Sequence, residues 1–212
     1  MSRKRQAQHR LGPQRDPAID EAVLRAAREL LIENGYAGTT IDAIATRAGV
    51  GRPAIYRRWP SKAHIVHDAV YPVMESEEVS DDVEIAEEIS RLTYGAVALF
   101  GDAAAREAVP GLMSEGRSDP ELRKALVTDQ LEVIREQLGR RLSAAVAAGE
   151  LRAGVDLDTL LDVIAGAAIF AQSSRDVQDQ ERLASTLVDI VLNGVMPAGS
   201  TTSSDRVPVP QV

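Results

Sequence analysis

The sequence predicts an all-α protein of about nine helices, and three observations carry that prediction. Apolar residues recur three and four positions apart in nearly every segment, whereas the alternation of two that marks a strand appears nowhere. Capping residues such as Asp16 and Asp119 precede these apolar stripes, and glycines such as Gly149 end them. Aromatic residues make up only 3% of the chain, so aliphatic side chains and alanine must fill the core.

The amino-terminal segment, residues 1–15, is basic and contains no acid. It is either a disordered, solubilising tail or a flexible arm that lies along DNA phosphates or enters a minor groove. A first, structural helix then begins with Asp16 as its cap and Pro17 in its first turn. Its apolar stripe continues to Leu31, and Gly35 closes it.

The segment of residues 40–59 has the pattern of two short helices joined by a tight turn. Thr40 caps the first helix, and Gly49 supplies the left-handed backbone that ends it. The second helix carries Pro53 in its first turn and turns Ile55 toward the core. Its other face consists of arginines and one aromatic residue, which suits a helix that reads the major groove of DNA. The pattern therefore predicts a helix-turn-helix.

The two aromatic residues of this segment, Tyr56 and Trp59, are expected to seal a small three-helix core. A further helix begins at Lys62, with Ser61 as its cap. Lys62 would then combine a cation with the free backbone N–H groups of a helix N-terminus, and together these clamp a phosphate. The two histidines of this helix are too few ligands for a metal site, so no metal is expected.

Charge divides the chain into a basic end and an acidic body. Residues 1–68 contain 12 Lys and Arg against 7 Asp and Glu, a net charge of +5, and the remaining residues contain 12 against 25, a net charge of −13. This division concentrates the attraction for phosphates at one end. The expected units are the arm at 1–15, a helix-turn-helix DNA-binding domain at 16–70, a helical body at 71–196 and a disordered tail at 197–212.

The composition argues against several other classes of protein. Without cysteine the chain has no disulfide, thiolate metal site or cysteine nucleophile. The longest apolar run, residues 163–171, is too short to span a bilayer, and no apolar segment follows the basic amino terminus, so a soluble cytoplasmic protein is expected. Ser114 lacks the first glycine of a nucleophile elbow, and no phosphate-binding glycine loop is present, so neither an enzyme nor a cofactor is expected.

Residues 27–70 resemble the DNA-binding region of the TetR family of transcriptional regulators. The order, spacing and residue types of that region recur here as Leu30-Leu31-x-x-Asn34-Gly35-Tyr36, Thr39-Thr40-Ile41-x-x-Ile44-Ala45-x-x-Ala48-Gly49-Val50 and Ile55-Tyr56-x-x-Trp59-Pro60-x-Lys62. The rest of the chain resembles the family only in the number and order of its helices.

The resemblance implies a set of residues that contact DNA: Thr40, Arg52, Pro53, Ala54, Tyr56, Arg57, Arg58 and Lys62. Thr40, Tyr56 and Lys62 match positions that touch the DNA backbone. The ring of Tyr56 is expected to pack inward while its hydroxyl reaches a phosphate.

The remaining members of that set match positions on the outer face of the second short helix. Arg52, Ala54 and Arg57 match positions that meet base edges, in agreement with arginine as a reader of guanine and alanine as a partner of the thymine methyl group. Pro53 matches a position that contacts the thymine methyl surface. Arg58 is either a further reader or a surface ion-pair partner.

The resemblance also implies a homodimer formed through the last two helices. The residues expected at this interface are Ile164, Ala165, Ala168, Ile169, Leu183, Leu187 and Ile190. The alternative is that the same residues form an ordinary intramolecular core. A two-fold dimer would place its two reader helices about 34–36 Å apart, one helical turn of duplex, on a palindromic site.

The expected function is a repressor that binds double-stranded operator DNA and is released by a small apolar ligand. The residues expected to line the ligand pocket are Leu92, Phe100, Met113, Leu131, Ile134, Leu138 and Phe170, each of which has plain core packing as its alternative. An activator, or a regulator without an effector, remains a second interpretation. A third is a module whose basic face binds an acidic protein.

Overall fold

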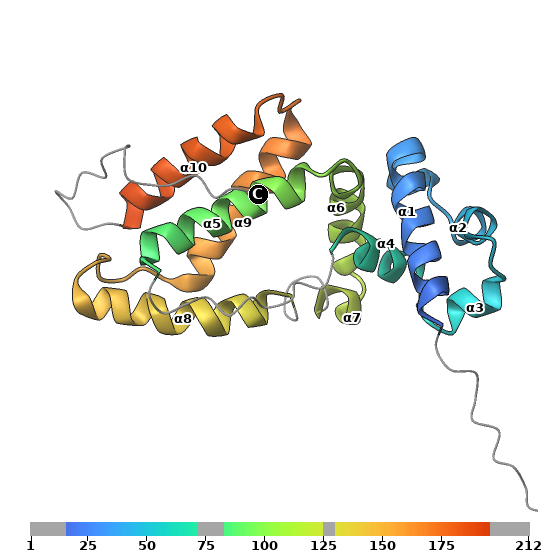
Figure 1. Cartoon of the computed structure of the whole chain (residues 1–212), viewed down its shortest axis with the longest axis horizontal. Coiled ribbons are helices and arrows are strands. Elements are labelled where there is room, and N and C mark those ends of the chain that lie inside the picture. The colour runs from blue at the N-terminus through green and yellow to red at the C-terminus, as the bar shows by residue number, and fades with distance from the viewer. Residues whose placement is uncertain (1–15, 72–82, 125–129, 196–212) are drawn as a thin grey trace, which may run out of the picture.

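The computed structural model describes residues 16–71, 83–124 and 130–195, and within them the all-α fold predicted from the sequence is confirmed (Figure 1). The described residues form ten helices. They are α1 (Pro17–Gly38), α2 (Ile41–Ala48), α3 (Arg52–Tyr56), α4 (Lys62–Val70), α5 (Ile85–Gly101), α6 (Ala103–Gly116), α7 (Pro120–Arg123), α8 (Gln130–Ala148), α9 (Leu157–Ser174) and α10 (Gln180–Val195).

The described residues form ten helices instead of the expected nine because one expected helix is divided into two. The sequence predicts a single helix between Asp119 and Gly149, whereas the structure gives α7 and α8, and residues 125–129 between them lie outside the described part. The basic arm at 1–15 and the tail at 197–212 also lie outside it. Gly35 breaks the first helix as predicted, because its φ of 66° and ψ of 178° are not helical, although the assigned helix continues to Gly38.

Helices α1 to α4 form a small domain at one end of the molecule (Figure 1). Its core contains Trp59, which is 3% exposed, together with the fully buried Ile44 and Ile55. The expectation that Tyr56 would help to seal this core is wrong, because 48% of its surface is exposed. In α3, which has five residues, Ile55 takes the inward position, so the next side chain is rotated away from the core.

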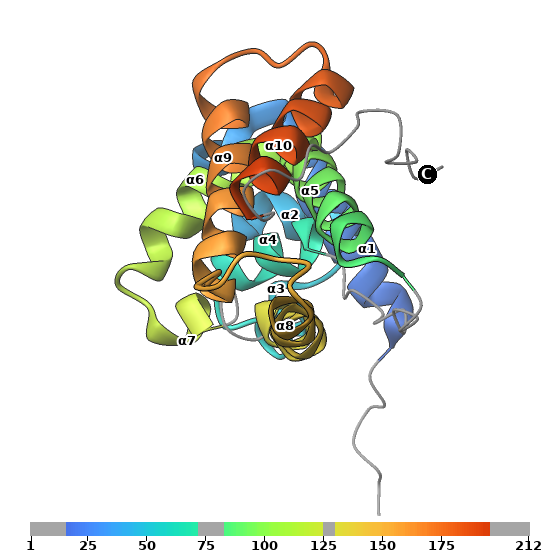
Figure 2. The same cartoon turned by 90° about the vertical axis from the view of Figure 1, so that its left-hand side faces the viewer.

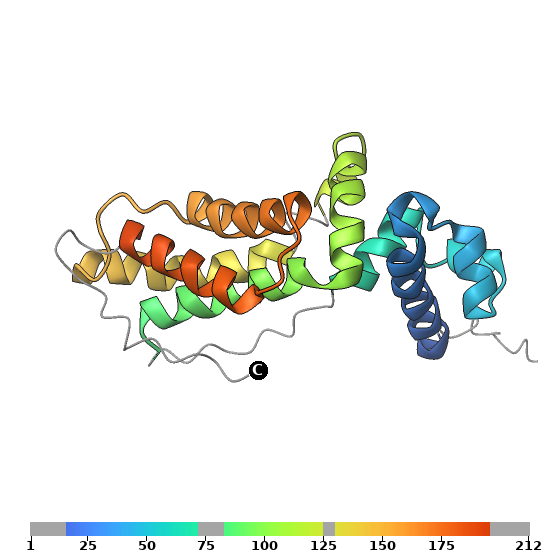
Figure 3. The same ribbon diagram turned by 90° about the horizontal axis from the view of Figure 1, so that it is seen from above.

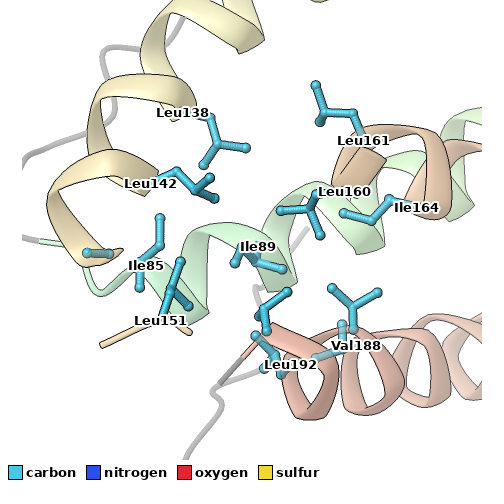
Figure 4. Packing of buried hydrophobic residues seen from close by; sticks show 13 residues of the cluster. Ile85, Ile89, Leu138, Leu142, Leu151, Leu160, Leu161, Ile164, Val188 and Leu192 are labelled. Atoms are coloured by element: carbon cyan, nitrogen blue, oxygen red, sulfur yellow. The ribbon is translucent and has the colours of Figure 1, made fainter. Parts of the chain in front are cut away.

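Helices α5, α8, α9 and α10 form the body of the chain around an aliphatic core (Figures 2 and 4). In Figure 2, α8 is seen end-on with α5, α9 and α10 above it. The labelled core residues in Figure 4 are Ile85, Ile89, Leu138, Leu142, Leu151, Leu160, Leu161, Ile164, Val188 and Leu192. The burial of these aliphatic side chains stabilises the body without aromatic residues, as the composition predicted.

Helix α6 lies between the body and the small domain and packs against α1 and α4 (Figure 3). The contact combines a shared apolar cluster with one bridging arginine. Arg28 of α1 donates one hydrogen bond to the carbonyl of Ala69 at 3.0 Å and pairs with Asp102, the cap of α6, at 2.8 Å. This contact connects α1, the end of α4 and the start of α6.

Candidate nucleic-acid interface

The turn between α2 and α3 is fixed by its capping and backbone geometry. The Thr40 hydroxyl oxygen accepts a hydrogen bond from the backbone N–H of Ala43 at 3.2 Å, which confirms the predicted cap. Gly49 ends α2 with a φ of 68°, in the left-handed region that glycine adopts without steric cost. The N–H of Val50 then donates to the carbonyl of Ala45 at 3.0 Å. These contacts hold α3 against α2 and leave the outer face of α3 open to solvent.

The outer face of α3 exposes Arg52, Pro53 and Tyr56. The Nε atom of Arg52 lies 2.9 Å from the Oδ1 atom of Asp42 in the first turn of α2. The guanidinium carbon of Arg52 also lies 6.0 Å from the centre of the Tyr56 ring. The Tyr56 hydroxyl and the Asp42 carboxylate both raise the pKa of Arg52 above its ordinary value. Arg52 is therefore oriented across the α2–α3 turn.

Arg57, directly after α3, is exposed like Arg52 but differs from it in its contacts. Within residues 16–71, 83–124 and 130–195 its side chain has no ion pair and no hydrogen bond. A guanidinium without internal partners can offer two donors to the edge of a guanine. Contact with a base would therefore cost Arg57 no interaction that the described structure contains.

The structure corrects the assignment of Arg58 to the DNA-contacting set. Its side chain is only 9% exposed and forms an ion pair with Asp20 of α1. Its guanidinium also donates to the carbonyl of Ala54 at 3.1 Å, and Ala54 itself is half-buried. An arginine enclosed in this way connects α3 to α1 and does not extend toward DNA.

Lys62, the expected phosphate clamp, has partners within the chain. The ammonium of Lys62 donates to the carbonyl of Tyr36 at 3.0 Å and lies 3.8 Å from the centre of the Tyr36 ring. Burial lowers the pKa of Lys62 from its ordinary value, and the nearby Glu115 carboxylate of α6 opposes that shift. The cation is therefore directed toward the end of α1 and the last turn of α6.

The predicted cap of α4 is wrong in its detail. The Ser61 hydroxyl makes no capping hydrogen bond and instead lies 2.9 Å from Nδ1 of His64. Trp59 instead connects to the last turn of α4, because its indole N–H donates to Asp68 at 2.8 Å. Burial disfavours the charged carboxylate, but hydrogen bonds from His67 and Trp59 outweigh it and hold the pKa of Asp68 below its ordinary value.

Asp42 is the residue of this interface that the sequence-based prediction missed. Its position in the first turn of α2 is readable from the sequence as a favourable place for an acid near a helix N-terminus. Because α2 and α3 are joined by a tight turn, Asp42 at the start of α2 comes close to Arg52 at the start of α3, and this proximity could have indicated the ion pair. An acid at this position orients Arg52, while Arg57 has no ion pair within the described part of the chain.

Both parts of the chain match known families. Residues 23–69 match the model described as bacterial regulatory proteins, tetR family, and residues 79–191, more than half of the chain, match the model described as tetracyclin repressor-like, C-terminal domain. The HTH-type transcriptional regulator YdeS of Bacillus subtilis is 27% identical over 208 residues, which cover 93% of this chain and 98% of YdeS.

Two solved structures are also similar. NalD, the secondary repressor of the MexAB-OprM multidrug efflux pump in Pseudomonas aeruginosa, is 26% identical with a TM-score of 0.62, covering 86% of this chain and 98% of NalD. FadR from Bacillus subtilis, in complex with stearoyl-CoA, shares the fold at 19% identity with a TM-score of 0.64, covering 82% of this chain and 98% of FadR.

The chain belongs to the TetR family of transcriptional regulators. It is therefore a DNA-binding transcriptional regulator with a helix-turn-helix, and its family is not an enzymatic one. Among the described residues, none of the helices combines the length and apolar character that crossing a membrane requires.

The residues expected at the dimer interface of this TetR-family regulator divide into two groups. Ile164 and Ala168 are 3% and 0% exposed within the single chain, so their assignment to an interface is wrong. Ala165, Ile169, Leu183 and Leu187 are half-buried, and Ile190 is 59% exposed. The stripe pattern failed for α9 because that helix is apolar nearly all round, and periodicity alone does not show which side faces the chain's own core.

The residues expected to line an apolar pocket in the TetR-family body lie in different surroundings, as far as their side chains are described. Leu138 is a core residue, and Leu92 and Ile134 pack against the same core. Met113 and Phe170 are 56% and 73% exposed, so their assignment to an interior pocket is wrong. Phe100 packs edge-on against Tyr71, while the side chain of Leu131 lies outside the described residues.

Proposed function

We propose that this TetR-family regulator is a repressor that binds a palindromic operator as a homodimer and is released by a small ligand bound in the helical body. The observation that carries the DNA-binding part is the outer face of α3, where Arg52 is oriented by Asp42 and Arg57 has no side-chain partner among the described residues. An arginine pair of this kind suits bidentate contact with guanines in the major groove. That NalD is a repressor supports the direction of regulation.

Thr40, Pro53, Ala54 and Tyr56 complete the proposed contact surface. The Thr40 hydroxyl accepts from the backbone of α2 and keeps its own proton for a phosphate oxygen. The exposed ring of Tyr56 supports Arg52 and places its hydroxyl at the edge of the same face. Pro53 is exposed and Ala54 half-buried, and their small apolar surfaces fit beside a thymine methyl group.

The homodimer is proposed to form through the outer sides of α9 and α10. Val163 and Phe170 lie two helical turns apart on one side of α9, and Ile190 is exposed on α10, with 49%, 73% and 59% of their surfaces exposed. Gly166 stands between the first two and has open space where a side chain would be, so a second copy can approach closely. Apolar side chains this exposed on adjacent helices are typical of an interface.

Selection of bound duplexes from a random pool, with the full chain, tests this proposal. The expected product contains two inverted half-sites with centres about 10 base pairs apart or a multiple of that. A single half-site, or no enrichment, would contradict the proposal. Placing the recovered site in a reporter promoter then separates repression, in which adding the protein lowers transcription, from activation.

Sedimentation of the wild type and of Phe170→Glu tests the dimer separately. A charge at the centre of the proposed apolar surface should convert a dimer to a monomer and weaken operator binding, because each half-site is then bound alone. Glu181→Gln, on the exposed start of α10, is the control for a surface charge change. Equal sedimentation of all three proteins as monomers would contradict the homodimer.

A further inference from the structure

A cavity of about 300 Å³, open at the surface, lies between α6 and the end of α9, and five of its seven lining residues are exposed. Its volume is at the lower end of the range for small-molecule sites. Its walls are formed by Arg106, Glu107, Pro110, Gln172, Ser173, Arg175 and Asp176. None of these residues was among the apolar ligand candidates, and the cavity lies beside α6, the helix that contacts the DNA-binding domain.

Gln172 is the residue of this cavity that most directly indicates a ligand. It is only 7% exposed, yet neither its amide nitrogen nor its amide oxygen has a hydrogen-bond partner within the described ranges. A buried amide without partners destabilises a protein, whereas an apolar residue in its place would not. A bound molecule would explain the buried amide of Gln172 if it accepted a hydrogen bond from the amide nitrogen and donated one to the amide oxygen.

The charges of the cavity narrow the chemistry of that molecule. Arg106 and Arg175 offer cationic donors, and Glu107 and Asp176 offer anionic acceptors, so the ionised lining is balanced. A simple anion would meet two carboxylates, and an apolar molecule would desolvate four charges. A molecule that carries both charges satisfies both sets of groups.

We propose that this cavity is the effector site and that it binds a small zwitterion of the amino-acid type. The carboxylate of such a molecule would pair with the arginines, its ammonium with the acids, and its remaining polar group with Gln172. This inference deepens the proposed function and rests on it for the regulatory consequence, although binding itself does not depend on DNA.

Two adjoining faces of α6 connect this cavity to the DNA-binding domain. Arg106 and Pro110, four residues apart, face the cavity. Glu107 lines the cavity and also lies against the break in α1, since a β-carbon on Gly35 would be 3.3 Å from its Oε2 atom. One turn later, a β-carbon on Gly111 would be 2.2 Å from the Tyr36 ring. A molecule that draws Arg106 and Glu107 toward α9 therefore acts on the helix that touches both Gly35 and Tyr36.

Pro110 makes α6 deformable at this level. Proline has no N–H, so the helical hydrogen bond to the carbonyl of Arg106 is missing, and helices bend most readily at such positions. The turn with the missing bond contains all three cavity residues of α6, Arg106, Glu107 and Pro110. A ligand that binds Arg106 would therefore change the bend of α6 at Pro110 and, with it, the position of the second half of α6 against Tyr36.

Thermal unfolding of the full chain with single free amino acids at millimolar concentration tests the site, with decanoate as the apolar comparison. At least one amino acid should raise Tm by about 3 °C or more once it exceeds its Kd tenfold. Arg175→Ala should abolish this shift, whereas Arg152→Ala, an exposed arginine outside the cavity, should retain it. Absence of any shift, a shift from decanoate alone, or a shift that persists in Arg175→Ala would overturn the proposal.

Gln172→Leu supplies a second measurement. Without ligand its Tm should exceed that of the wild type by about 2 °C, since the unpaired amide is gone, and the amino-acid shift should disappear. A lower ligand-free Tm together with a retained shift would assign Gln172 a structural role and overturn the proposal.

Titration of the recovered operator separates the site from the proposed function. The stabilising amino acid should weaken operator binding by the wild type and leave Arg175→Ala unaffected. A protein that shows the amino-acid shift but binds no operator contradicts the proposed function and supports the site. Unchanged operator affinity in the presence of a stabilising amino acid overturns the effector role.

Discussion

The outer face of α3 and the first turn of α4 each carry a cation that the sequence assigns to DNA, but the two cations have different surroundings. Arg57, at the end of α3, has no partner in the described part of the chain, whereas Lys62 is bound to the carbonyl and ring of Tyr36. Lys62 lies against α1 on the side where α6 also makes contact. The outer face of α3 is therefore an open surface, which we propose meets DNA, whereas the contact of Lys62 with Tyr36 belongs to the closed contact between the DNA-binding domain and the body.

The largest effect is expected from Gly111→Ala, which breaks the closed contact. The new β-carbon would lie 2.2 Å from the Tyr36 ring, so α6 and α1 must separate, and we expect a loss of about 3 kcal/mol of unfolding free energy. Gly95→Ala is the control, because a β-carbon there meets nothing within 4 Å and a helix gains about 0.5–1 kcal/mol from alanine. Equal stability of both variants in urea would show that the contact is loose.

Arg57→Ala removes one of the two proposed base-reading arginines from the open surface, the outer face of α3. Loss of a bidentate base contact should cost about 2 kcal/mol of operator affinity and relax base choice at one position per half-site, with no change in unfolding free energy. Arg140→Ala, exposed on α8, is the control. An unchanged site preference in a repeated duplex selection would remove Arg57 from the residues that read bases.

Lys62→Met tests whether the two cations differ as the structure indicates. Loss of a phosphate-binding lysine would reduce the slope of log affinity against log salt by about one unit per subunit. Because Lys62 is bound to Tyr36, the slope for Lys62→Met should stay within about half a unit of the wild-type slope. We expect unfolding free energy to change by less than about 1 kcal/mol. A slope reduced by a full unit would return Lys62 to the DNA-contacting set.

The smallest effect is expected from Asp68→Asn, which keeps an acceptor for the Trp59 indole and removes the charge. The folded-state pKa of Asp68 lies below its ordinary value, so the charge stabilises the fold above the unfolded pKa of about 3.9 and loses that effect as pH falls through the lower folded value. At pH 7 the variant should be less stable by on the order of 0.5 kcal/mol. Thermal unfolding across pH should show this gap close in acid; a constant gap would contradict the assignment.

Sequence signals were sufficient wherever the deciding contact is local. The cap at Thr40 and the left-handed turn at Gly49 depend on residues within a few positions, and both are confirmed. The predicted burial of Trp59, three residues after α3, is also confirmed. The contact of these residues with DNA stays a prediction.

The sequence was insufficient wherever the partner is distant. Arg58 pairs with Asp20, 38 residues earlier, and Lys62 with Tyr36, 26 residues earlier. No spacing rule places those pairs, because they depend on how α1 packs across α3 and α4. Phe170 was assigned inward for a related reason, since an all-round apolar helix does not show which side its own chain covers.

The positions of the small domain and the acidic body at opposite ends of the molecule have a kinetic consequence (Figure 1). Residues 16–68 carry 7 Lys and Arg against 7 Asp and Glu, whereas residues 83–124 and 130–195 carry 11 against 18, a net charge of −7, so the described part of the chain has an electric dipole with its negative end in the body. Near a duplex this dipole experiences a torque that turns α3 toward the phosphates and the body away before any contact forms. Productive encounters become frequent at low ionic strength, and added salt slows arrival through loss of orientation as well as attraction.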